Sequence, residues 1–302
     1  MDDETYEQAV AGVLRETITD EIIAAFGLAS RGWQRRLFGP VFWLPAQIFG
    51  RLMAGIDRTV GEQGVPEAAK RLLKYFVDDL QVSGYGNIPQ EGPVLIASNH
   101  PGAYDSVAIL ACLPRTDVKV VVSDIPFLRS MPTASRMMVY ATPGTQGRMT
   151  AVRGMVRQMQ QGGALMIFPS GLVDPDPDVL PDAEKELESW SSSLELVMKK
   201  VPKTKLIVTI ASGVLSPVCL RNPLTRLRKK EWEKRKLAEF LQVIQQLALK
   251  RKFGLKPRLT FDVALSGSEL LAQSESADLH LAIIARARQV LRMHMETAPN
   301  PG

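Results

Sequence analysis

The sequence predicts an α/β protein with a largely parallel central sheet that is covered by helices and preceded by a helical N-terminal segment. Three observations predict this fold. From about residue 82 onward, short apolar runs bounded by Gly and Pro alternate with helical stretches, as in chains built from strand–helix–strand units. Several of these runs are apolar at almost every position, which is typical of strands buried on both faces. Residues 4 to about 80 show helical spacing of apolar positions and no alternating strand pattern.

The predicted strands are the short apolar runs themselves, at 93–98, 118–123, 137–141, 164–168, 205–211 and 258–265. The predicted helices of this part lie at 104–113, 147–161, 182–200, 224–251 and 268–295. We therefore expect two parts: a helical N-terminal, membrane-surface segment over residues 1–80, and an α/β domain over residues 81–302.

Composition and chain start predict a cytoplasmic protein. Of the 302 residues, 45% are hydrophobic and 23% are charged, as in ordinary globular proteins. The first ten residues are acidic and lack the basic-then-apolar order of a signal peptide. The longest apolar candidate, residues 37–50, contains two prolines and is shorter than the ~18–20 residues that span a bilayer. Cys112 and Cys219 stand among apolar residues without metal-ligand spacing, so we expect both to be reduced and buried.

An aromatic patch in the N-terminal segment is bracketed by arginines between residues 31 and 58, and its most prominent members are Trp33, Phe42 and Trp43. Such an arrangement is typical of an interfacial helix, in which the rings enter the headgroup boundary and the cations meet anionic lipid. The alternative is a helical hairpin packed on the main domain. Because Pro40 and Pro45 are expected to interrupt any long buried helix, we favour contact with the inner face of an anionic membrane.

A second charged region, residues 221–258, holds 13 Lys and Arg residues against three Glu, whereas the whole chain carries only +5. This concentration points to an anionic partner, such as lipid headgroups or an acidic acyl carrier protein. The alternative is a solvated basic helix face with a core-packed opposite side. No recognised nucleic-acid motif accompanies the charge, so we expect no nucleic-acid partner.

His100, one of three histidines, follows the apolar run 93–98 and stands five residues before Asp105. Ligands of open α/β sheets gather at the carboxyl ends of strands. Across a strand–turn–helix corner, Asp105 can accept the Nδ1 hydrogen of His100 and leave Nε2 free as a general base. The alternative is a turn histidine followed by a helix-capping aspartate. No nucleophile with a base of its own is apparent nearby, so we expect the base to activate a substrate hydroxyl directly. An acyl-thioester is a suitable donor because a thiol of pKa ~8.5 leaves readily.

The stretch GYGNIPQEGPVLIASNHPGAYDS, residues 84–106, resembles the opening block of the glycerolipid acyltransferases, the glycerol-3-phosphate and 1-acylglycerol-3-phosphate acyltransferase family, whose signature is N-H-x-x-x-x-D. GGALMIFPSG, residues 162–171, resembles that family's strand ending in F-P-E-G. The resemblance implies that His100 is the base and Asp105 its orienter, with an acyl-thioester of coenzyme A or acyl carrier protein as co-substrate and no metal or organic cofactor. It implies an acceptor site formed by Asn99, Arg148, Arg153, Phe168, Pro169, Ser170 and Gly171.

Two departures from the family pattern concern the acceptor. Ser170 replaces the usual Glu. A serine also occurs at this place in the soluble plastid-type glycerol-phosphate acyltransferases, so the change need not mean inactivity. The segment 174–188 then carries seven acids and one lysine, which would repel a phosphate unless the loop turns away or an arginine intervenes. We interpret this loop as a solvated turn in which Asp182 caps the next helix. It does not have the residues of an EF-hand, since Val179 and Lys185 replace the required Gly and Glu.

The predicted function is transfer of a fatty acyl group from an acyl-thioester to a hydroxyl of a glycerol-phosphate or lyso-phospholipid type acceptor. A neutral hydroxylated acceptor remains open, as do acyl length, donor and oligomeric state. The alternatives are a hydrolase that uses the same base to activate water, and a catalytically silent lipid-binding protein.

Overall fold

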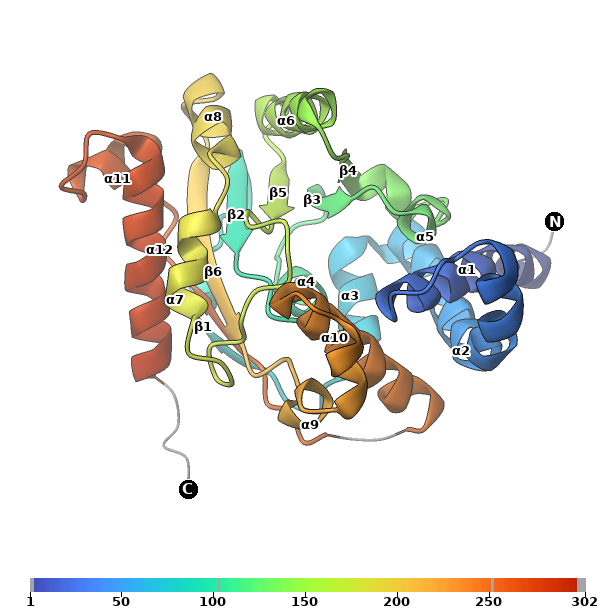
Figure 1. Ribbon diagram of the computed structural model, residues 1–302. Helices are drawn as coiled ribbons and strands as arrows, with labels where there is room; N and C mark the ends of the chain where they lie inside the picture. The colour runs from blue at the N-terminus through green and yellow to red at the C-terminus, as the bar shows by residue number, and fades with distance from the viewer. Residues whose placement is uncertain (1–2, 103, 251–252, 298–302) are drawn as a thin grey trace.

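The computed structural model describes residues 3–102, 104–250 and 253–297. Seven strands form one sheet in the order β1-β7-β6-β2-β5-β3-β4 (Figure 1). They are β1 (Gln81–Ser83), β2 (Val94–Ser98), β3 (Val118–Ser123), β4 (Met138–Ala141), β5 (Ala164–Ile167), β6 (Lys205–Ser212) and β7 (Arg258–Phe261). All neighbouring strands are parallel except β6 and β7. The predicted α/β class with a largely parallel sheet is therefore confirmed.

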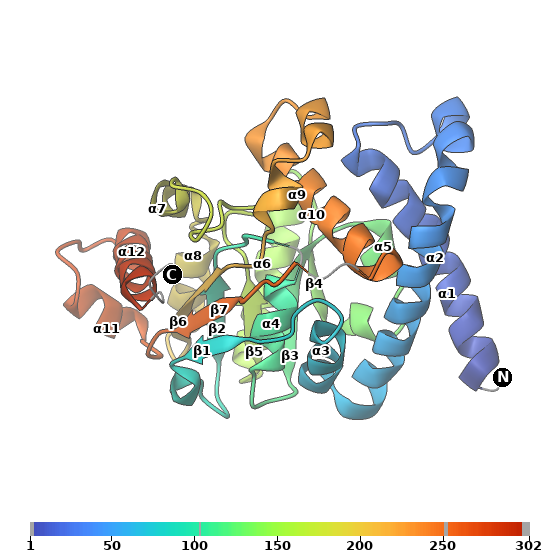
Figure 2. The same cartoon turned by 90° about the horizontal axis from the view of Figure 1, so that it is seen from below.

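Helices cover both faces of this sheet (Figure 2). They are α1 (Asp3–Ala25), α2 (Gly32–Gln63), α3 (Val65–Leu73), α4 (Asp105–Ala111), α5 (Pro126–Arg129), α6 (Thr145–Gln160), α7 (Ala183–Glu186), α8 (Ser193–Lys200), α9 (Pro217–Leu220), α10 (Glu231–Ala248), α11 (Gly267–Ala272) and α12 (Leu279–Glu296). None of the helices in the described part of the chain has the length and apolar character needed to span a bilayer.

Alternate residues of the central strands point into two separate hydrophobic clusters, as the two-residue period of a strand requires. On β2, Val94 and Ile96 join a cluster with α1, α2, α3 and α4. Leu95 and Ala97 join a second cluster with α6, α8 and α12. The N-terminal helices thus share a core with one face of the sheet.

Helix α2 runs without a break through Pro40 and Pro45. The prediction that these prolines interrupt a long helix is therefore wrong. Each proline removes a hydrogen bond to the carbonyl group four residues earlier, which belongs to Arg36 and Val41. Both of these residues are exposed, so water can satisfy the freed carbonyl groups.

Three predicted long helices are shorter or divided, and serine hydroxyls bind backbone N–H groups at two of the breaks. The helix predicted over 182–200 divides before α8, where Ser191 Oγ accepts a hydrogen bond from the Ser193 N–H. The helix predicted over 268–295 divides before α12, where Ser274 and Ser276 hydroxyls accept backbone N–H groups. Serine side chains compete with the helix for these groups. The helix predicted from 224 begins as a 3-10 turn, and α10 starts only at Glu231.

Candidate functional site

The site lies where β2 and β5 end side by side. These strands are parallel neighbours, and their register pairs Ala97 with Ile167. The chain that leaves each strand therefore emerges at the same edge of the sheet. The imidazole of His100 stacks on the ring of Phe168, with ring centroids 4.2 Å apart and an angle of 19° between the ring planes. The two sequence motifs are thus brought into direct contact.

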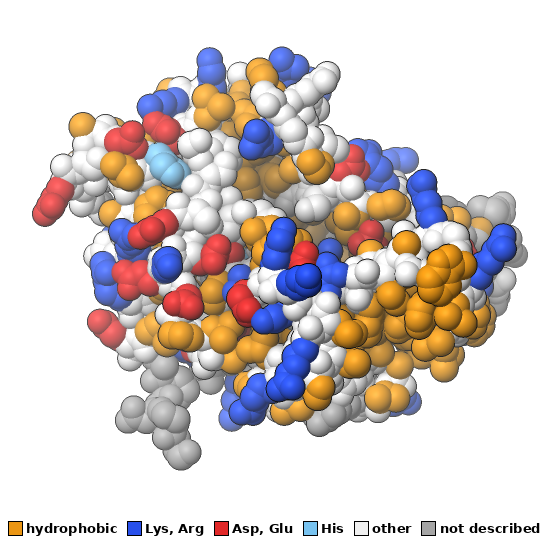
Figure 3. Space-filling model, in the orientation of Figure 1, with side chains coloured by type: hydrophobic (Ala, Val, Ile, Leu, Met, Phe, Trp, Pro, Cys, Tyr) orange, Lys and Arg blue, Asp and Glu red, His pale blue; other side chains and the backbone are white. Residues whose placement is uncertain are grey.

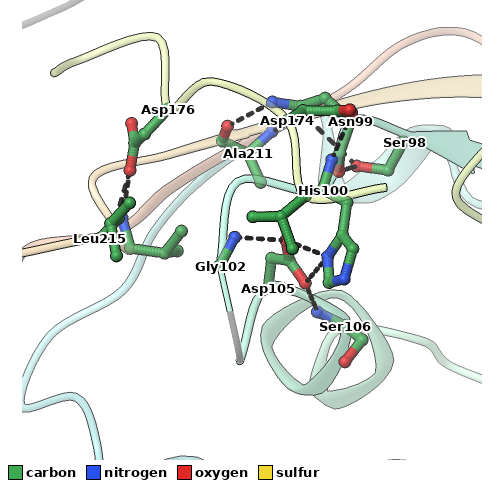
Figure 4. Close-up of polar contacts among 12 residues, drawn as sticks. Ser98, Asn99, His100, Gly102, Asp105, Ser106, Asp174, Asp176, Ala211 and Leu215 are labelled. Carbon is green, nitrogen blue, oxygen red and sulfur yellow. Dashed lines mark hydrogen bonds and ion pairs between the residues drawn. The ribbon is translucent and has the colours of Figure 1, made fainter. Parts of the chain in front are cut away.

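Asp105 holds the imidazole of His100 from the first turn of α4 (Figure 4). The Nδ1 atom of His100 lies 2.9 Å from Oδ2 and 3.1 Å from Oδ1 of this carboxylate. Asp105 also accepts hydrogen bonds from the Gly102 and Ser106 N–H groups. Its side chain is fully buried, whereas 27% of the His100 side chain is exposed. In this geometry the Nδ1–H group of His100 donates its hydrogen bond to the Asp105 carboxylate. The Nε2 atom remains available for a ligand.

The backbone of His100 is fixed by the acidic loop that follows β5. The His100 N–H donates to Asp174 Oδ2 over 2.9 Å, and the Asp174 N–H donates to the His100 carbonyl over 2.7 Å. Asn99 fixes the same corner from the other side, because its amide group donates to the Ala211 carbonyl and accepts from the Ala211 N–H on β6. Asn99, which was predicted to bind substrate, is buried, and both the nitrogen and the oxygen of its side-chain amide bind the protein backbone.

The acidic loop turns inward, so its description as a solvated turn is wrong. Asp176 is fully buried and accepts hydrogen bonds from the N–H groups of Gly213, Val214 and Leu215. Asp178 forms an ion pair with Arg258. Asp182 precedes α7 but makes no side-chain capping hydrogen bond. Asp174, Asp176 and Asp178, the first three acids of the loop, therefore all have partners within the protein.

Replacing Asp176 by Ala is expected to lower the free energy of unfolding by about 3 kcal/mol, because the N–H groups of residues 213–215 lose their common acceptor. Chemical denaturation of both proteins measures this difference. The control is Asp182→Ala, an exposed residue of the same loop, which should change the free energy of unfolding by no more than about 0.5 kcal/mol. Equal losses in the two variants would show that the buried carboxylate does not hold the loop.

Several ionisable groups around His100 have displaced pKa values. Burial lowers the pKa of His100, but Asp105, together with Glu239 and Asp174, raises it more, to about 9. Burial raises the pKa of Asp174 to about 6. Burial likewise raises the pKa of Glu239 to about 7, with His100 acting in the opposite direction. Such displaced values are typical of functional sites, in which charged groups share a desolvated space.

His100 lines a cavity of about 430 Å³ whose walls are predominantly apolar. The apolar walls come from helices α1, α2, α3, α5 and α10 and from the face of the sheet that they cover. Among the described residues, the ionisable side chains that line it are His100, Glu21, Lys236 and Glu239, besides the phenol of Tyr104. Tyr104 Oη accepts a hydrogen bond from the Gln242 amide on α10. The cavity therefore joins the imidazole to a large apolar space.

The remaining predicted residues of the acceptor site lie in different places. Pro169 is buried and its carbonyl accepts from the Ser191 N–H, while Ser170 Oγ donates to the Leu172 carbonyl. Gly171 adopts a positive φ of 67° in this turn, which favours glycine. Arg148 and Arg153 are exposed on α6, and neither lines the cavity. Their helix follows β4, which lies three strand spacings from β2, roughly 14 Å at ~4.8 Å per strand.

Sequence reasoning missed Lys236 and Glu239. Both belong to a stripe along α10 at helical spacing, formed by Lys236, Glu239, Phe240, Val243, Ile244 and Leu247, and all six line the cavity. The signal that could have found them is a pair of charges in register with an otherwise apolar helix face.

The predicted membrane-contact residues occupy two environments. Trp33 and Trp43 are exposed, by 69% and 48%, as are Leu37, Val41 and Leu44 of the same helix. Phe42 is half-buried and packs on Phe26, with ring centroids 5.1 Å apart. Hydrophobic side chains gather on the face that α1 and α2 present in Figure 3. We name the exposed set Trp33, Leu37, Val41, Trp43 and Leu44 the α2 patch.

One of three comparisons with known proteins agrees with the motifs. A family model described as Acyltransferase matches residues 79–212, which confirms the resemblance drawn from residues 84–106 and 162–171. A search of curated proteins found no match. Seven chains among the solved structures match. One is the crystal structure of the 1-acyl-sn-glycerophosphate (LPA) acyltransferase PlsC from Thermotoga maritima, with 13% identity, a TM-score of 0.49, and coverage of 95% of this chain and 99% of that chain.

Proposed function

We propose that this chain transfers a fatty acyl group from an acyl-thioester to a hydroxyl of a glycerol-phosphate or lyso-phospholipid type acceptor. The match of residues 79–212 to a family model described as Acyltransferase supports the proposal. One observation carries the proposal: His100, which Asp105 holds at Nδ1, lines an apolar cavity of about 430 Å³. A base at the end of such a cavity suits a substrate with one reactive polar group and a long apolar chain.

In the proposed step, the acceptor hydroxyl oxygen forms a bond to the thioester carbonyl carbon while its proton passes to His100 Nε2. The carbon–sulfur bond then breaks, and the departing thiolate takes that proton and leaves as the thiol. Asp105 stabilises the imidazolium that forms in between, because its carboxylate faces Nδ1 at 2.9 Å. The step balances with coenzyme A or acyl carrier protein as the only co-substrate and requires no acyl-enzyme.

The cavity walls favour a long acyl chain. Apolar side chains from α2, α3 and α10, including Met53, Leu72 and Leu247, line most of this space. Each methylene group transferred from water into such surroundings contributes about 0.8 kcal/mol. We therefore assign the apolar part of the cavity to the acyl group.

A phosphorylated acceptor is compatible with the acidic loop. Asp174, Asp176 and Asp178 are engaged with backbone N–H groups or Arg258, so they do not line the cavity. Lys236 does line it and supplies a positive charge, while Glu21 and Glu239 line the same cavity. We propose a phosphate-bearing acceptor that Lys236 binds, and a neutral acceptor is the alternative outcome of the experiment below.

The hydrolase alternative, in which His100 activates water, is decided by the acceptor dependence of thiol release in the experiment below. A hydrolase with a serine nucleophile would need another site, and one Ser–His pair lies elsewhere, in which Ser212 Oγ is 2.7 Å from His294 Nε2. Both residues are buried, and neither lines the cavity. Burial, followed by the charge of Arg258, lowers the pKa of His294 to about 4. This pair holds β6 against α12 and has no access to a substrate.

The experiment that tests the proposal follows thiol release from a long-chain acyl-thioester with parallel acceptors: glycerol-3-phosphate, 1-acylglycerol-3-phosphate, a neutral lyso-lipid, and none. We expect release that depends on a phosphorylated acceptor, together with a matching acylated product. Equal release without any acceptor would favour hydrolysis, and no release from any mixture would contradict acyl transfer.

We further propose that the α2 patch contacts an anionic membrane surface, where aromatic rings and arginines are favoured together. Exposed Arg31, Arg36 and Arg51 accompany the patch on α2 or beside its first turn. The triple variant Trp33→Ser, Leu37→Ser and Trp43→Ser should reduce co-sedimentation with anionic vesicles at least tenfold. It should leave the melting temperature unchanged, because all three side chains are exposed.

The matched control for this membrane prediction is Leu281→Ser, which removes an apolar side chain that is 55% exposed on α12. It should bind vesicles as the parent protein does. Unchanged binding by the triple variant would show that the α2 patch is not the contact surface.

A further inference from the structure

The carboxylate of Glu239 is buried at the cavity, and one of its oxygens accepts no hydrogen bond from the described residues. The residue is 8% exposed and lines the same cavity as His100. Its Oε1 atom has no hydrogen-bond partner among the described residues. By contrast, the buried carboxylates of Asp105 and Asp176 each accept several N–H groups. A buried carboxylate without such partners is costly, so a ligand is its natural partner.

The surroundings of Glu239 prevent it from turning to solvent. Three residues further along α10, Gln242 donates to the Tyr104 hydroxyl and to the Val214 carbonyl and accepts from the Ser216 N–H. One turn beyond that, Gln246 donates to the Phe76 carbonyl. These bonds fix the helix against α4, the loop after β6 and the end of α3. The carboxylate of Glu239 is therefore held at the cavity wall.

The chemistry of the transfer step determines which group of the acceptor can donate a hydrogen bond to Glu239. The reacting hydroxyl has one proton, and that proton goes to His100 Nε2. A carboxylate that is hydrogen-bonded to the acceptor at the same time needs a second donor. An ammonium group is disfavoured, because Lys236 lies one turn away on the same face of α10 and lines the same cavity. A second hydroxyl meets both requirements.

We infer that Glu239 accepts a hydrogen bond from a second hydroxyl of the acceptor, adjacent to the hydroxyl that is acylated. The inference rests on the proposed acyl transfer and narrows it. It selects an acceptor that carries two neighbouring hydroxyls and a phosphate, as glycerol-3-phosphate does, over a 1-acylglycerol-3-phosphate, which has one hydroxyl left. Lys236 supplies the cation for the phosphate. Glu239 is thus a specificity-determining residue.

The test compares two acceptors that differ by the second hydroxyl: glycerol-3-phosphate and 1,3-propanediol monophosphate. The parent protein should prefer glycerol-3-phosphate at least tenfold in kcat/KM. Glu239→Leu should remove this preference by raising KM for glycerol-3-phosphate, with KM for the acyl-thioester unchanged. Glu239→Gln, which keeps one acceptor oxygen, should lose the preference only in part. Glu231→Gln, an exposed residue of the same helix, should behave as the parent protein does.

Stability measurements separate this role from a structural one. Glu239→Leu removes a buried carboxylate whose Oε1 atom has no hydrogen-bond partner among the described residues, so the melting temperature of this variant should equal or exceed that of the parent protein. Glu239→Gln provides the same comparison if the leucine variant does not fold. An undiminished preference for glycerol-3-phosphate in these variants, or transfer to 1-acylglycerol-3-phosphate alone, would overturn the inference while acyl transfer stands. Absence of acceptor-dependent thiol release from the parent protein would overturn both.

Discussion

Replacement of His100 by Ala should reduce kcat/KM for acyl transfer by a factor of about 10²–10⁴, because the imidazole is the base that removes the acceptor proton. The side chains that position it stay in place without it. Asp105 keeps its hydrogen bonds from the Gly102 and Ser106 N–H groups, and Asp174 keeps its bond to the backbone N–H at position 100. The effect should therefore appear in the rate and not in the fold.

The measurement is thiol release with the preferred acceptor, accompanied by thermal unfolding of each protein. His100→Gln serves as a second variant, because it preserves polarity and approximate size while it cannot act as a base. Both variants should lose activity to the same extent. Activity close to that of the parent protein in either folded variant would exclude His100 as the base.

Replacement of Asp105 by Asn should lower the maximal rate by about two to four orders of magnitude, since the amide neither fixes the required tautomer nor stabilises the imidazolium. It should also change the pH profile. In the parent protein the pKa of His100 is raised to about 9, so kcat/KM should increase with pH up to about that value as the neutral base forms. Without the Asp105 charge, burial lowers the pKa of His100, and this rise should move to lower pH.

Linkage gives a second measurement on the same variant. A histidine whose pKa is higher in the folded state stabilises that state fully below the unfolded pKa, and the contribution is lost as pH rises through the folded pKa. For His100 this window runs from about 6.5 to about 9. The parent protein should lose stability across this window, and Asp105→Asn should lose less. Identical pH dependence of unfolding in the two proteins would contradict the assigned ion pair.

The strands of the sheet could be predicted where burial on both faces gives an unbroken apolar run in the sequence. β2, β5 and β6 are almost wholly buried, and their unbroken apolar runs show it. β1 was not predicted, because it has three residues and alternating exposure. Its place in the sheet comes from pairing Val82 with Leu259, a partner that local sequence does not reveal.

The His100–Asp105 corner could be predicted because a strand end, a turn and a helix start adjoin in the sequence. The acidic loop could not be read in the same way. Asp174 and Asp176 look solvated in the sequence, but their partners are backbone N–H groups from other loops, at His100 and at residues 213–215. Glu239 was missed for a related reason. It stands in a strongly basic segment, and only the packing of α10 on the cavity shows that it faces inward.

The strand order has a consequence for how the chain acquires its fold during synthesis. β1 has β7 as its neighbour in the sheet, and their register joins Gln81 to Arg258. When a ribosome has released the family-matched residues 79–212, β1 still lacks its neighbour, and α10 has yet to form one wall of the cavity. The nascent intermediate therefore exposes apolar surface until α10 and β7 have been synthesised, and such a surface is prone to aggregation. A fragment cut at residue 212 would be arrested in that state.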